Sequence, residues 1–286
     1  MIKSPLRYPG GKSKAIKFIA PLIPNFKEYR EPFLGGGSVF IYLKQLYPDR
    51  IYWVNDIYTN LFYFWQSCQE NLEDLIEQII AWKQEFQDGK LLYKYLTENI
   101  EKFNELEKAS AFFVFNRITF SGTTESGGYS QKAFEKRFTD SSIERVKNLS
   151  QIINNVRITN YDYHKVLETQ GKDVFLFLDP PYYSAEKSAL YGKRGQLHKG
   201  FDHEKLAYIL QHTNHKWLIT YDDSDYIRNL FSWANIQSWN LTYGMRNING
   251  NINQNGKELF IANYDLSLKE INNNKHQQLE IFTNVC

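Results

Sequence analysis

The chain has 286 residues, a formal net charge of only +2 and a hydrophobic content of 42%, enough for one large α/β domain or a core with an inserted subdomain. Because the charge is nearly balanced, contact with a nucleic acid would need a local basic face. Cys68 and Cys286 are far apart and lack metal-ligand spacing, which argues against a disulfide framework and a zinc site. The N-terminus lacks the apolar segment of a signal peptide, and no apolar run approaches membrane-spanning length. We therefore expect a cytoplasmic protein without membrane association.

A glycine-containing turn comes first, where residues 7–13 are Arg-Tyr-Pro-Gly-Gly-Lys-Ser. Its Gly-Lys-Ser ending is similar to that of a phosphate-binding loop, but Leu6 stands where that loop needs its first glycine. We expect a helix to follow over Ser13–Leu22. A lysine at a helix start is unfavourable without an anionic partner, so Lys12 is a candidate for binding a carboxylate or phosphate. A plain turn with a solvated lysine explains this segment equally well.

A second glycine turn lies between a strand and a helix. We expect the strand over Tyr29–Phe33, the turn at Gly35–Gly37 and the helix to about Leu46, an arrangement typical of nucleotide-binding α/β folds. Ile51–Val54 then reads as the next strand. Asp56 follows it, about twenty residues past the glycines, where an acid can bind ribose hydroxyls. A tight turn with a solvated aspartate is the structural alternative.

The pattern becomes helical between Leu61 and Phe115. Residues 71–80 have helical apolar spacing, and residues 91–96 also suit a helix. Residues 109–115 suit a helix or a strand, because periodicity cannot decide over so short an apolar run. No alternation of strands and helices is present here, so we expect a helical insertion into the α/β domain.

A polar, glycine-rich segment with interspersed aromatic residues follows at residues 116–132. It suits a surface loop, or a loop or hairpin that contacts DNA through its amide, hydroxyl and basic side chains. A local basic excess continues to Lys147, and Ser141 with Glu144 predicts a capping box for a helix to about Ile153. The candidate DNA-binding residues are Asn116, Arg117, Ser121, Thr123, Thr124, Tyr129, Lys132 and Arg137.

The strand pattern resumes at Val156–Asn160, and Asp162 and Tyr163 stand at the end of this expected strand. A helix to about Thr169 leads into the apolar run 173–178, which reads as a buried parallel strand. Residues 184–200 form a polar loop that could close over a substrate or be merely solvated. We then expect a helix from Asp202, a strand at 216–221 and a helix at 222–231. An antiparallel pair at 236–241 and 259–264 surrounds an Asn-rich loop, and the tail after Leu268 is expected to be loose.

The buried strand at 173–178 ends in Asp179-Pro180-Pro181-Tyr182. Two consecutive prolines cannot donate ladder hydrogen bonds and have φ fixed near −65°, so they form a stiff turn where ligands of open α/β sheets bind. Asp179 and the Pro180 carbonyl could accept both protons of an aromatic amine while Tyr182 stacks on its ring. The structural alternative is a helix-capping aspartate followed by a proline turn. Tyr183 has no such role, and we expect it to pack.

Together these motifs resemble the Dam-like (alpha group) DNA adenine-N6 methyltransferase family, from Arg7 to about Tyr264. The resemblance rests on Tyr-Pro-Gly-Gly-Lys at 8–12, Glu-Pro-Phe-Leu-Gly-Gly-Gly-Ser-Val-Phe at 31–40, Asn-Asp at 55–56, Asp-Tyr at 162–163 and Asp-Pro-Pro-Tyr at 179–182. It implies a Rossmann-like α/β sheet that uses S-adenosyl-L-methionine and yields S-adenosyl-L-homocysteine without a metal. By resemblance, the catalytic residues are Asp179, Pro180 and Tyr182, and the cofactor-binding residues are Tyr8, Lys12, Phe33, Gly35, Gly37, Asp56, Asp162, Tyr163 and Asp179.

The resemblance also implies a domain organisation and a substrate. Residues 1–60 and 154–286 would form the catalytic domain, and residues 61–153 an inserted, mainly helical target-recognition domain for double-stranded DNA. The target adenine would leave the duplex, because its N6 cannot meet the cofactor methyl group inside the stack. The segment 120–125 lacks the Asn-Gly usual in members that read GATC, so the recognised sequence stays open. A cognate restriction endonuclease is a candidate partner, and the sequence is silent on the oligomeric state.

Other functions fit parts of the pattern. The chain could methylate another planar amine or amide, such as cytosine N4, an adenine in RNA or a protein glutamine. Asp179 rather than Ser or Asn before the two prolines favours adenine by resemblance. A non-catalytic nucleic-acid-binding protein with a degenerate cofactor fold is the remaining alternative, but the intact Lys12, Asp56 and Asp179 argue against it.

Overall fold

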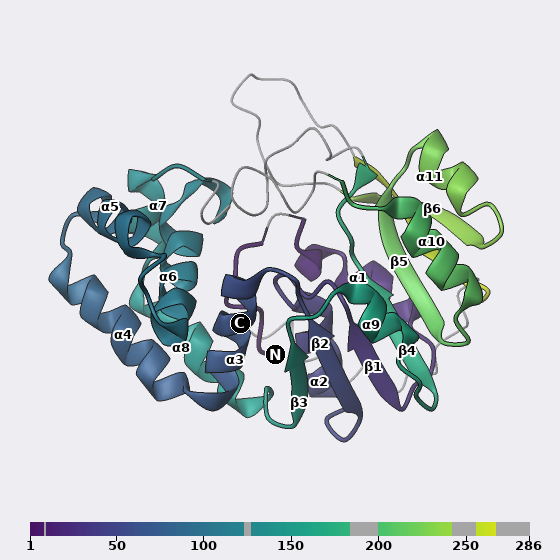
Figure 1. Ribbon diagram of the computed structural model, residues 1–286, viewed down its shortest axis with the longest axis horizontal. Helices are drawn as coiled ribbons and strands as arrows, with labels where there is room; N and C mark the ends of the chain where they lie inside the picture. The colour runs from purple at the N-terminus through teal and green to yellow at the C-terminus, as the bar shows by residue number, and fades with distance from the viewer. Residues whose placement is uncertain (9, 123–126, 184–199, 242–255, 267–286) are drawn as a thin grey trace.

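The computed structural model describes residues 1–8, 10–122, 127–183, 200–241 and 256–266, and its centre is a mixed sheet (Figure 1). In these residues the strand order is β3-β2-β1-β4-β5-β7-β6. The strands are β1 (Glu28–Glu31), β2 (Ile51–Asn55), β3 (Val156–Thr159), β4 (Val174–Leu178), β5 (Lys216–Asp222), β6 (Asn235–Leu241) and β7 (Gly256–Ala262). The first five run parallel, and β7 pairs antiparallel with both β5 and β6. The expected α/β sheet with an antiparallel closing pair is confirmed.

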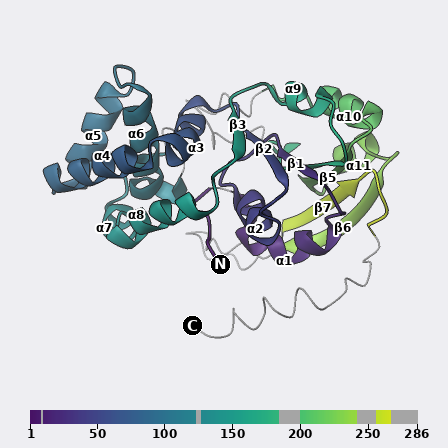
Figure 2. The same ribbon diagram turned by 90° about the horizontal axis from the view of Figure 1, so that it is seen from below.

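Helices cover both faces of the sheet (Figure 2). On one face lie η1 (Lys12–Lys14), α1 (Ile16–Ile19), η2 (Ala20–Leu22) and α2 (Ser38–Leu46), and on the other lie α9 (Tyr163–Glu168), α10 (His203–His212) and α11 (Asp225–Leu230). Strand β4 shows why both faces must be covered: Phe175 and Phe177 join one hydrophobic cluster, whereas its other three residues join the second. The helix expected over 13–22 is divided into three short pieces, and α11 begins later than expected because β5 continues through Asp222.

A helical group lies beside β3 (Figure 1). It consists of α3 (Thr59–Glu70), α4 (Leu72–Glu85), α5 (Gly89–Asn99), α6 (Glu105–Ile118), η3 (Phe120–Gly122), α7 (Gln131–Arg137), α8 (Asp140–Lys147) and η5 (Asn148–Gln151). Helix α6 packs against α3, α4, α5 and α7. Its residues 109–118 are all buried, so they form a helix without showing amphipathic periodicity. The capping box expected at Ser141 and Glu144 is wrong: α8 begins after Thr139, whose amide donates to Ser142 Oγ at 3.2 Å.

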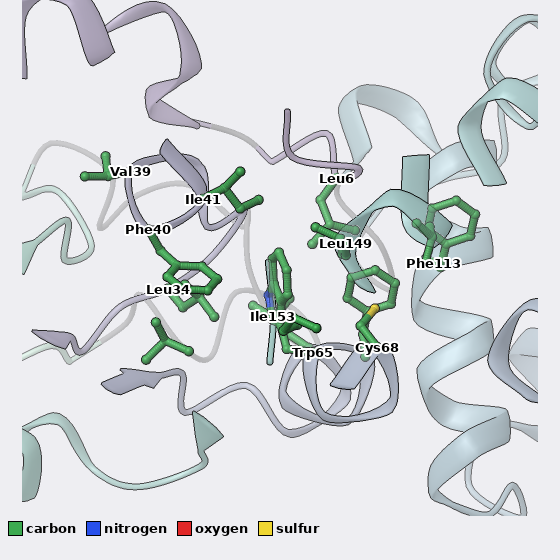
Figure 3. Packing of buried hydrophobic residues seen from close by; sticks show 14 of the residues in the cluster. Leu6, Leu34, Val39, Phe40, Ile41, Trp65, Cys68, Phe113, Leu149 and Ile153 are labelled. Carbon is green, nitrogen blue, oxygen red and sulfur yellow. The ribbon is translucent and has the colours of Figure 1, made fainter. Parts of the chain in front are cut away.

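One hydrophobic cluster runs from the sheet into the helical group (Figure 3). Trp65 of α3 packs beside Leu34 of the glycine loop, and Cys68 of the same helix lies toward Phe113 of α6. The Trp65 indole also donates to the Gly35 carbonyl at 3.1 Å. The division into residues 1–60 with 154–286 and residues 61–153 stays a prediction, since the buried cluster crosses it. No described helix is long and apolar enough to cross a membrane.

Asn116 ties the N-terminal segment to α6. Its Oδ1 accepts from the Arg7 amide at 2.9 Å, and its Nδ2 donates to the Arg7 carbonyl at 2.8 Å and to the Gly122 carbonyl at 3.2 Å. The side chain is buried, so its amide is used inside the protein. Gly122 is required beside it, because a Cβ there would lie 2.3 Å from the Arg7 carbonyl oxygen.

We predict that Asn116→Ala lowers the free energy of unfolding by about 2–3 kcal/mol, because three hydrogen bonds of a buried side chain are lost and three backbone groups lose their partner. Asn154→Ala is the matched control: that exposed side chain makes one bond, to the Ser150 carbonyl, and its loss should change stability by less than about 0.5 kcal/mol. Urea denaturation followed by circular dichroism measures both. Equal stability of the two variants would contradict the role of Asn116.

Candidate active site

The site lies at the carboxyl ends of β1 and β4. These two strands pair in parallel, with Glu28 opposite Val174 and Arg30 opposite Leu176. The chain runs outward from β1 to β2 and β3 and then returns to β4 on the other side of β1. The strand order therefore reverses between β1 and β4, and such a switch point is where open α/β sheets bind ligands. The glycine loop after β1 and the Asp-Pro-Pro-Tyr turn after β4 meet there.

The glycine loop needs its glycines for two reasons. Gly35 and Gly37 have φ of 48° and 62°, the left-handed region that side chains other than glycine rarely adopt. A Cβ at Gly35 would lie 2.9 Å from the Tyr8 ring, and one at Gly37 would lie 3.0 Å from the Trp65 ring. The backbone of the loop is thus held closely between two aromatic side chains, and Gly37 is the residue from which α2 begins.

Asp56 is fixed against this loop. Its Oδ2 accepts from the Gly35 amide at 2.8 Å, and its Oδ1 accepts from the Tyr58 amide at 3.0 Å. Burial raises the pKa of Asp56 to about 6, although both backbone hydrogen bonds act to lower it. The residue is nevertheless not fully covered, since its exposure is intermediate.

Asn55 holds the neighbouring strand ends together. Its Nδ2 donates to the Pro32 and Tyr161 carbonyls, each at 3.0 Å. Its Oδ1 accepts from the Thr159 hydroxyl at 2.7 Å and from the Tyr161 amide at 2.8 Å. One buried side chain therefore sets the spacing of the loops after β1, β2 and β3.

The buried Lys12 forms an ion pair with the partly exposed Asp179. The Lys12 ammonium lies 2.7 Å from Asp179 Oδ1, donates to the Gly10 carbonyl at 3.0 Å and is only 4% exposed. Thr220 of β5 donates to the same Asp179 oxygen at 2.8 Å. The reading of Lys12 as a solvated lysine is therefore wrong: its anionic partner is a carboxylate of the protein. Asp179 Oδ1 is thus the oxygen that contacts both Lys12 and Thr220.

Tyr182 lies beside this pair. The Lys12 ammonium is 5.1 Å from the centre of its ring, and its hydroxyl donates to Glu258 Oε2 at 3.1 Å. Burial raises the pKa of Tyr182 well above its ordinary value, so the phenol is neutral. Sequence reasoning missed Glu258, because nothing in the strand pattern around it indicates an inward-facing acid. Tyr183 stacks on Tyr226 at 4.3 Å, as expected of a packing residue.

An aromatic cluster lies at the ends of β1 and β3. The ring centres of Phe33 and Tyr163 are 5.3 Å apart, and Phe201 lies 5.7 Å from Phe33 and 5.5 Å from Tyr163. Phe201 was not predicted, because it follows the polar loop without any motif. Asp162 is exposed, and its Oδ1 accepts from the His164 amide at 3.2 Å, which caps α9.

The candidate DNA-binding residues differ in their surroundings. The buried Asn116 side chain makes the hydrogen bonds to Arg7 and Gly122 described above. Arg117 is 3% exposed and lies over the Phe113 ring. Tyr129 is half-buried and forms an antiparallel bridge with Thr119, Lys132 is exposed, and Arg137 is partly exposed. Thr123, Thr124 and the Ser121 side chain lie outside the described residues, as do positions 184–199, 242–255 and 267–286.

Arg117 has unusual electrostatic surroundings. Burial and the charges of Arg145, Arg7 and Arg137 lower the pKa of Arg117 to about 9. Its Nε has no hydrogen-bond partner among the described residues. A buried cation among three further cations is costly unless an anion compensates it. The described part of the chain holds no cluster of His, Cys, Asp and Glu that could bind a metal.

Comparison with known proteins identifies the chain. The sequence model of the D12 class N6 adenine-specific DNA methyltransferases matches residues 8–245. Type II methyltransferase M.MjaIII of Methanocaldococcus jannaschii is 26% identical over 212 residues, which are 66% of this chain and 72% of that protein. Modification methylase StsI of Streptococcus sanguinis is 25% identical over 96% of this chain but only 45% of its own length. DNA adenine methylase of Vibrio cholerae is 22% identical over 81% of this chain and 85% of its own. The glycine loop, Asp56 and the Asp-Pro-Pro-Tyr turn all fall inside the matched residues, and the chain belongs to the D12 class N6 adenine-specific DNA methyltransferase family.

Proposed function

We propose that this site transfers the methyl group of S-adenosyl-L-methionine to N6 of an adenine that has left a DNA duplex. The observation that supports this most is the meeting of the glycine loop and Asp56 with Asp179 and Tyr182 at one switch point. The first half of the site, the glycine loop with Asp56, suits a nucleoside with a ribose. The second half, Asp179 with Tyr182, suits a planar amine. The alternatives with cytosine N4, RNA or a protein amide have no observation in their favour, since the family acts on adenine in DNA.

The residues of the first half fit the cofactor. Asp56 presents a carboxylate to ribose hydroxyls, and the half-buried rings of Phe33, Tyr163 and Phe201 offer faces for an adenine. Gly35 and Gly37 allow the backbone to approach a ligand closely, with Tyr8 behind them. When bound, the cofactor supplies a methyl group on a positively charged sulfur. Asp162 and Lys12 complete the proposed cofactor-binding set.

The residues of the second half position the adenine. Asp179 and the Pro180 carbonyl accept hydrogen bonds from the N6 amine, while the base lies on Tyr182. Lys12 holds the Asp179 carboxylate, and the amine must share or replace that contact. Accepting both N6 protons leaves the nitrogen lone pair free to attack. The arrangement is a hydrogen-bonding clamp at the end of a rigid strand, which favours a defined geometry.

The DNA would bind along the helical group. We propose that a phosphate of the DNA backbone neutralises the positive charge of the cluster formed by Arg7, Arg117, Arg137 and Arg145. Phosphates are the anionic groups of a duplex, and arginine binds them through charge-assisted hydrogen bonds. Tyr129 and Lys132 lie along the chain between Arg117 and Arg137, and with Ser121, Thr123 and Thr124 they remain the candidates for base contacts. Asn116 supports this segment from inside. We also propose that residues 61–153 recognise the target DNA and that the remaining residues carry out catalysis. A cognate restriction endonuclease is a proposed partner.

We predict that Asp179→Ala lowers methyl transfer to DNA by about 10²–10³-fold or more, since it removes a preorganised acceptor at the reacting nitrogen. Cofactor affinity, measured by calorimetry, should change little. Asp49→Ala, at an exposed residue just before the amino end of β2, is the control and should keep wild-type turnover. Near-normal turnover by the Asp179 variant, measured with tritiated cofactor, would refute the assignment.

We predict that Asp56→Ala weakens cofactor binding about 10–100-fold, the loss of one charged hydrogen bond to a ribose. The wild-type affinity should also fall as the pH drops below about 6, because the ionised form of Asp56 is the acceptor and its pKa is raised to about 6. Titration calorimetry at several pH values tests both points. An affinity of Asp56→Ala equal to wild type would remove the ribose role.

We predict that Arg117→Met weakens DNA binding and reduces the salt slope of the affinity by about 0.9, the share of one phosphate contact. Without DNA the variant should be as stable as wild type or more stable, because a buried uncompensated cation is replaced by an apolar side chain of similar length. Arg50→Met, beside the amino end of β2, is the control and should leave the slope unchanged. Fluorescence anisotropy with a labelled duplex measures the slope, and an unchanged slope for Arg117→Met would contradict the phosphate contact.

A further inference from the structure

Glu258 is a buried acid with no role in the function described above. It lies on β7 directly opposite Asp222 of β5 and is 2% exposed. Its Oε1 is buried without a hydrogen-bond partner among the described residues. Like charges opposite each other on antiparallel strands are destabilising, and a buried polar atom without a partner is costly, whereas an apolar residue would pack without either penalty. The presence of Glu258 therefore calls for an explanation other than the stability of the sheet.

These two acids bind two consecutive residues that follow the proline pair. The Tyr182 hydroxyl donates to Glu258 Oε2 at 3.1 Å, and the Tyr183 amide donates to Asp222 Oδ1 at 3.1 Å. The Tyr183 ring also stacks on Tyr226 at 4.3 Å. The main chain just after Tyr182 is thus held by Asp222, and the far end of the Tyr182 side chain is held by Glu258.

The hydrogen bond to Glu258 fixes the position of the Tyr182 ring. A tyrosine side chain has several staggered positions about its Cα–Cβ bond, and the hydroxyl is the atom that moves farthest between them, so a hydrogen bond there selects one position. The hydroxyl lies on the Cβ–Cγ axis, so the same bond does not fix rotation of the ring about that axis. Two neighbours limit this rotation: the Lys12 ammonium lies 5.1 Å from the ring centre, and the Tyr221 ring lies 6.1 Å away at 42°.

We propose that Glu258 is a positioning residue for the target base: through the Tyr182 hydroxyl it fixes the ring on which the adenine lies. This inference rests on the proposed methyl transfer to N6. The stacking surface sets the plane of the base and therefore the direction in which N6 approaches the methyl group, and a small misplacement of reacting atoms lowers the rate strongly. Without Glu258 the ring would offer the same face in more than one position, so fewer bound bases would be aligned for transfer.

The first test is Glu258→Met, which removes the acceptor but keeps an unbranched side chain. The rate of methyl transfer is measured in a single turnover with saturating cofactor and a DNA duplex that the wild-type protein methylates. The rate should fall about 10–100-fold, as expected for misplaced reacting atoms. Cofactor affinity, measured by calorimetry, should stay at the wild-type value, because Glu258 acts on the half of the site that holds the base.

Two matched variants show what the loss is due to. Glu258→Gln keeps the size of the side chain and an oxygen that can accept from the Tyr182 hydroxyl, so it should recover most of the rate lost in Glu258→Met. Gln237→Met places the same side chain at an exposed position of the neighbouring strand β6 and should keep the wild-type rate. A Glu258→Gln variant as slow as Glu258→Met would overturn the inference.

Tyr182→Phe tests whether Glu258 acts through the hydroxyl. This variant keeps the ring but not the hydrogen bond, so it should be slowed about as much as Glu258→Met. The variant with both changes should be no slower than either single variant, because both changes break the same bond. If the two losses multiply instead, Glu258 acts by another route and the inference is overturned.

Stability separates a positioning role from a structural one. In the Tyr182→Phe background, Glu258→Met removes a buried acid without leaving a hydroxyl unpaired, so the double variant should unfold at the same urea concentration as Tyr182→Phe or at a higher one. A less stable double variant would show that Glu258 serves the fold, and it would overturn the inference.

The failure of this inference differs from the failure of the proposed function. A wild-type rate for Glu258→Met overturns the positioning role and leaves the methyl transfer intact. Absence of adenine methylation by the wild-type protein would instead overturn the proposed function, and the positioning role with it.

Discussion

Parallel pairing of β1 with β4 brings together two loops that lie far apart in the sequence. The residues between them build β2, β3 and the helical group, and the chain then returns to the sheet beside the strand from which it left. Because the carboxyl ends of the paired strands coincide, the glycine loop and the Asp-Pro-Pro-Tyr turn face the same space. The ion pair between Lys12 and Asp179 adds the N-terminal turn to that space. A shift of this one pairing would separate all three.

The charge distribution of the site follows from this convergence. Asp179 pairs with Lys12, and three further acids, Glu31, Asp56 and Glu258, have pKa values raised chiefly by burial, to about 8, 6 and 7 respectively. Desolvated acids near neutrality leave the site weakly negative and able to hold or release protons. Such a site suits a positively charged donor such as a sulfonium, and it also suits a reaction that generates one proton.

The helical group is attached to the site by packing as well as by chain connectivity. Trp65 supports the glycine loop from α3, and Asn116 holds the N-terminal segment from α6. Asn116 and Arg117 are neighbours in sequence and both are buried, but only Asn116 is satisfied within the described part of the protein. The residue that the protein satisfies stabilises the fold, and the residue that it leaves unsatisfied is the better candidate for an external anion. In the proposed function, this link would connect DNA bound along the helices with the base at Asp179.

The sequence by itself determined the order of the strands along the chain, the glycine loop and the Asp-Pro-Pro-Tyr turn, because these depend on local backbone conformation and apolar runs. It also made Lys12 a candidate for an anionic partner, since a cation at a helix start is unfavourable without one, but a solvated lysine fitted the sequence equally well. Only the tertiary structure decided which anion this is, because Lys12 and Asp179 lie in segments far apart in the sequence that the fold brings together. The same holds for Glu258 and Phe201, which no motif marks, and for residues 109–115, where a helix buried on every side has no periodicity to read. Sequence patterns record local geometry and exposure, whereas a site built from several strand ends depends on which strands are neighbours.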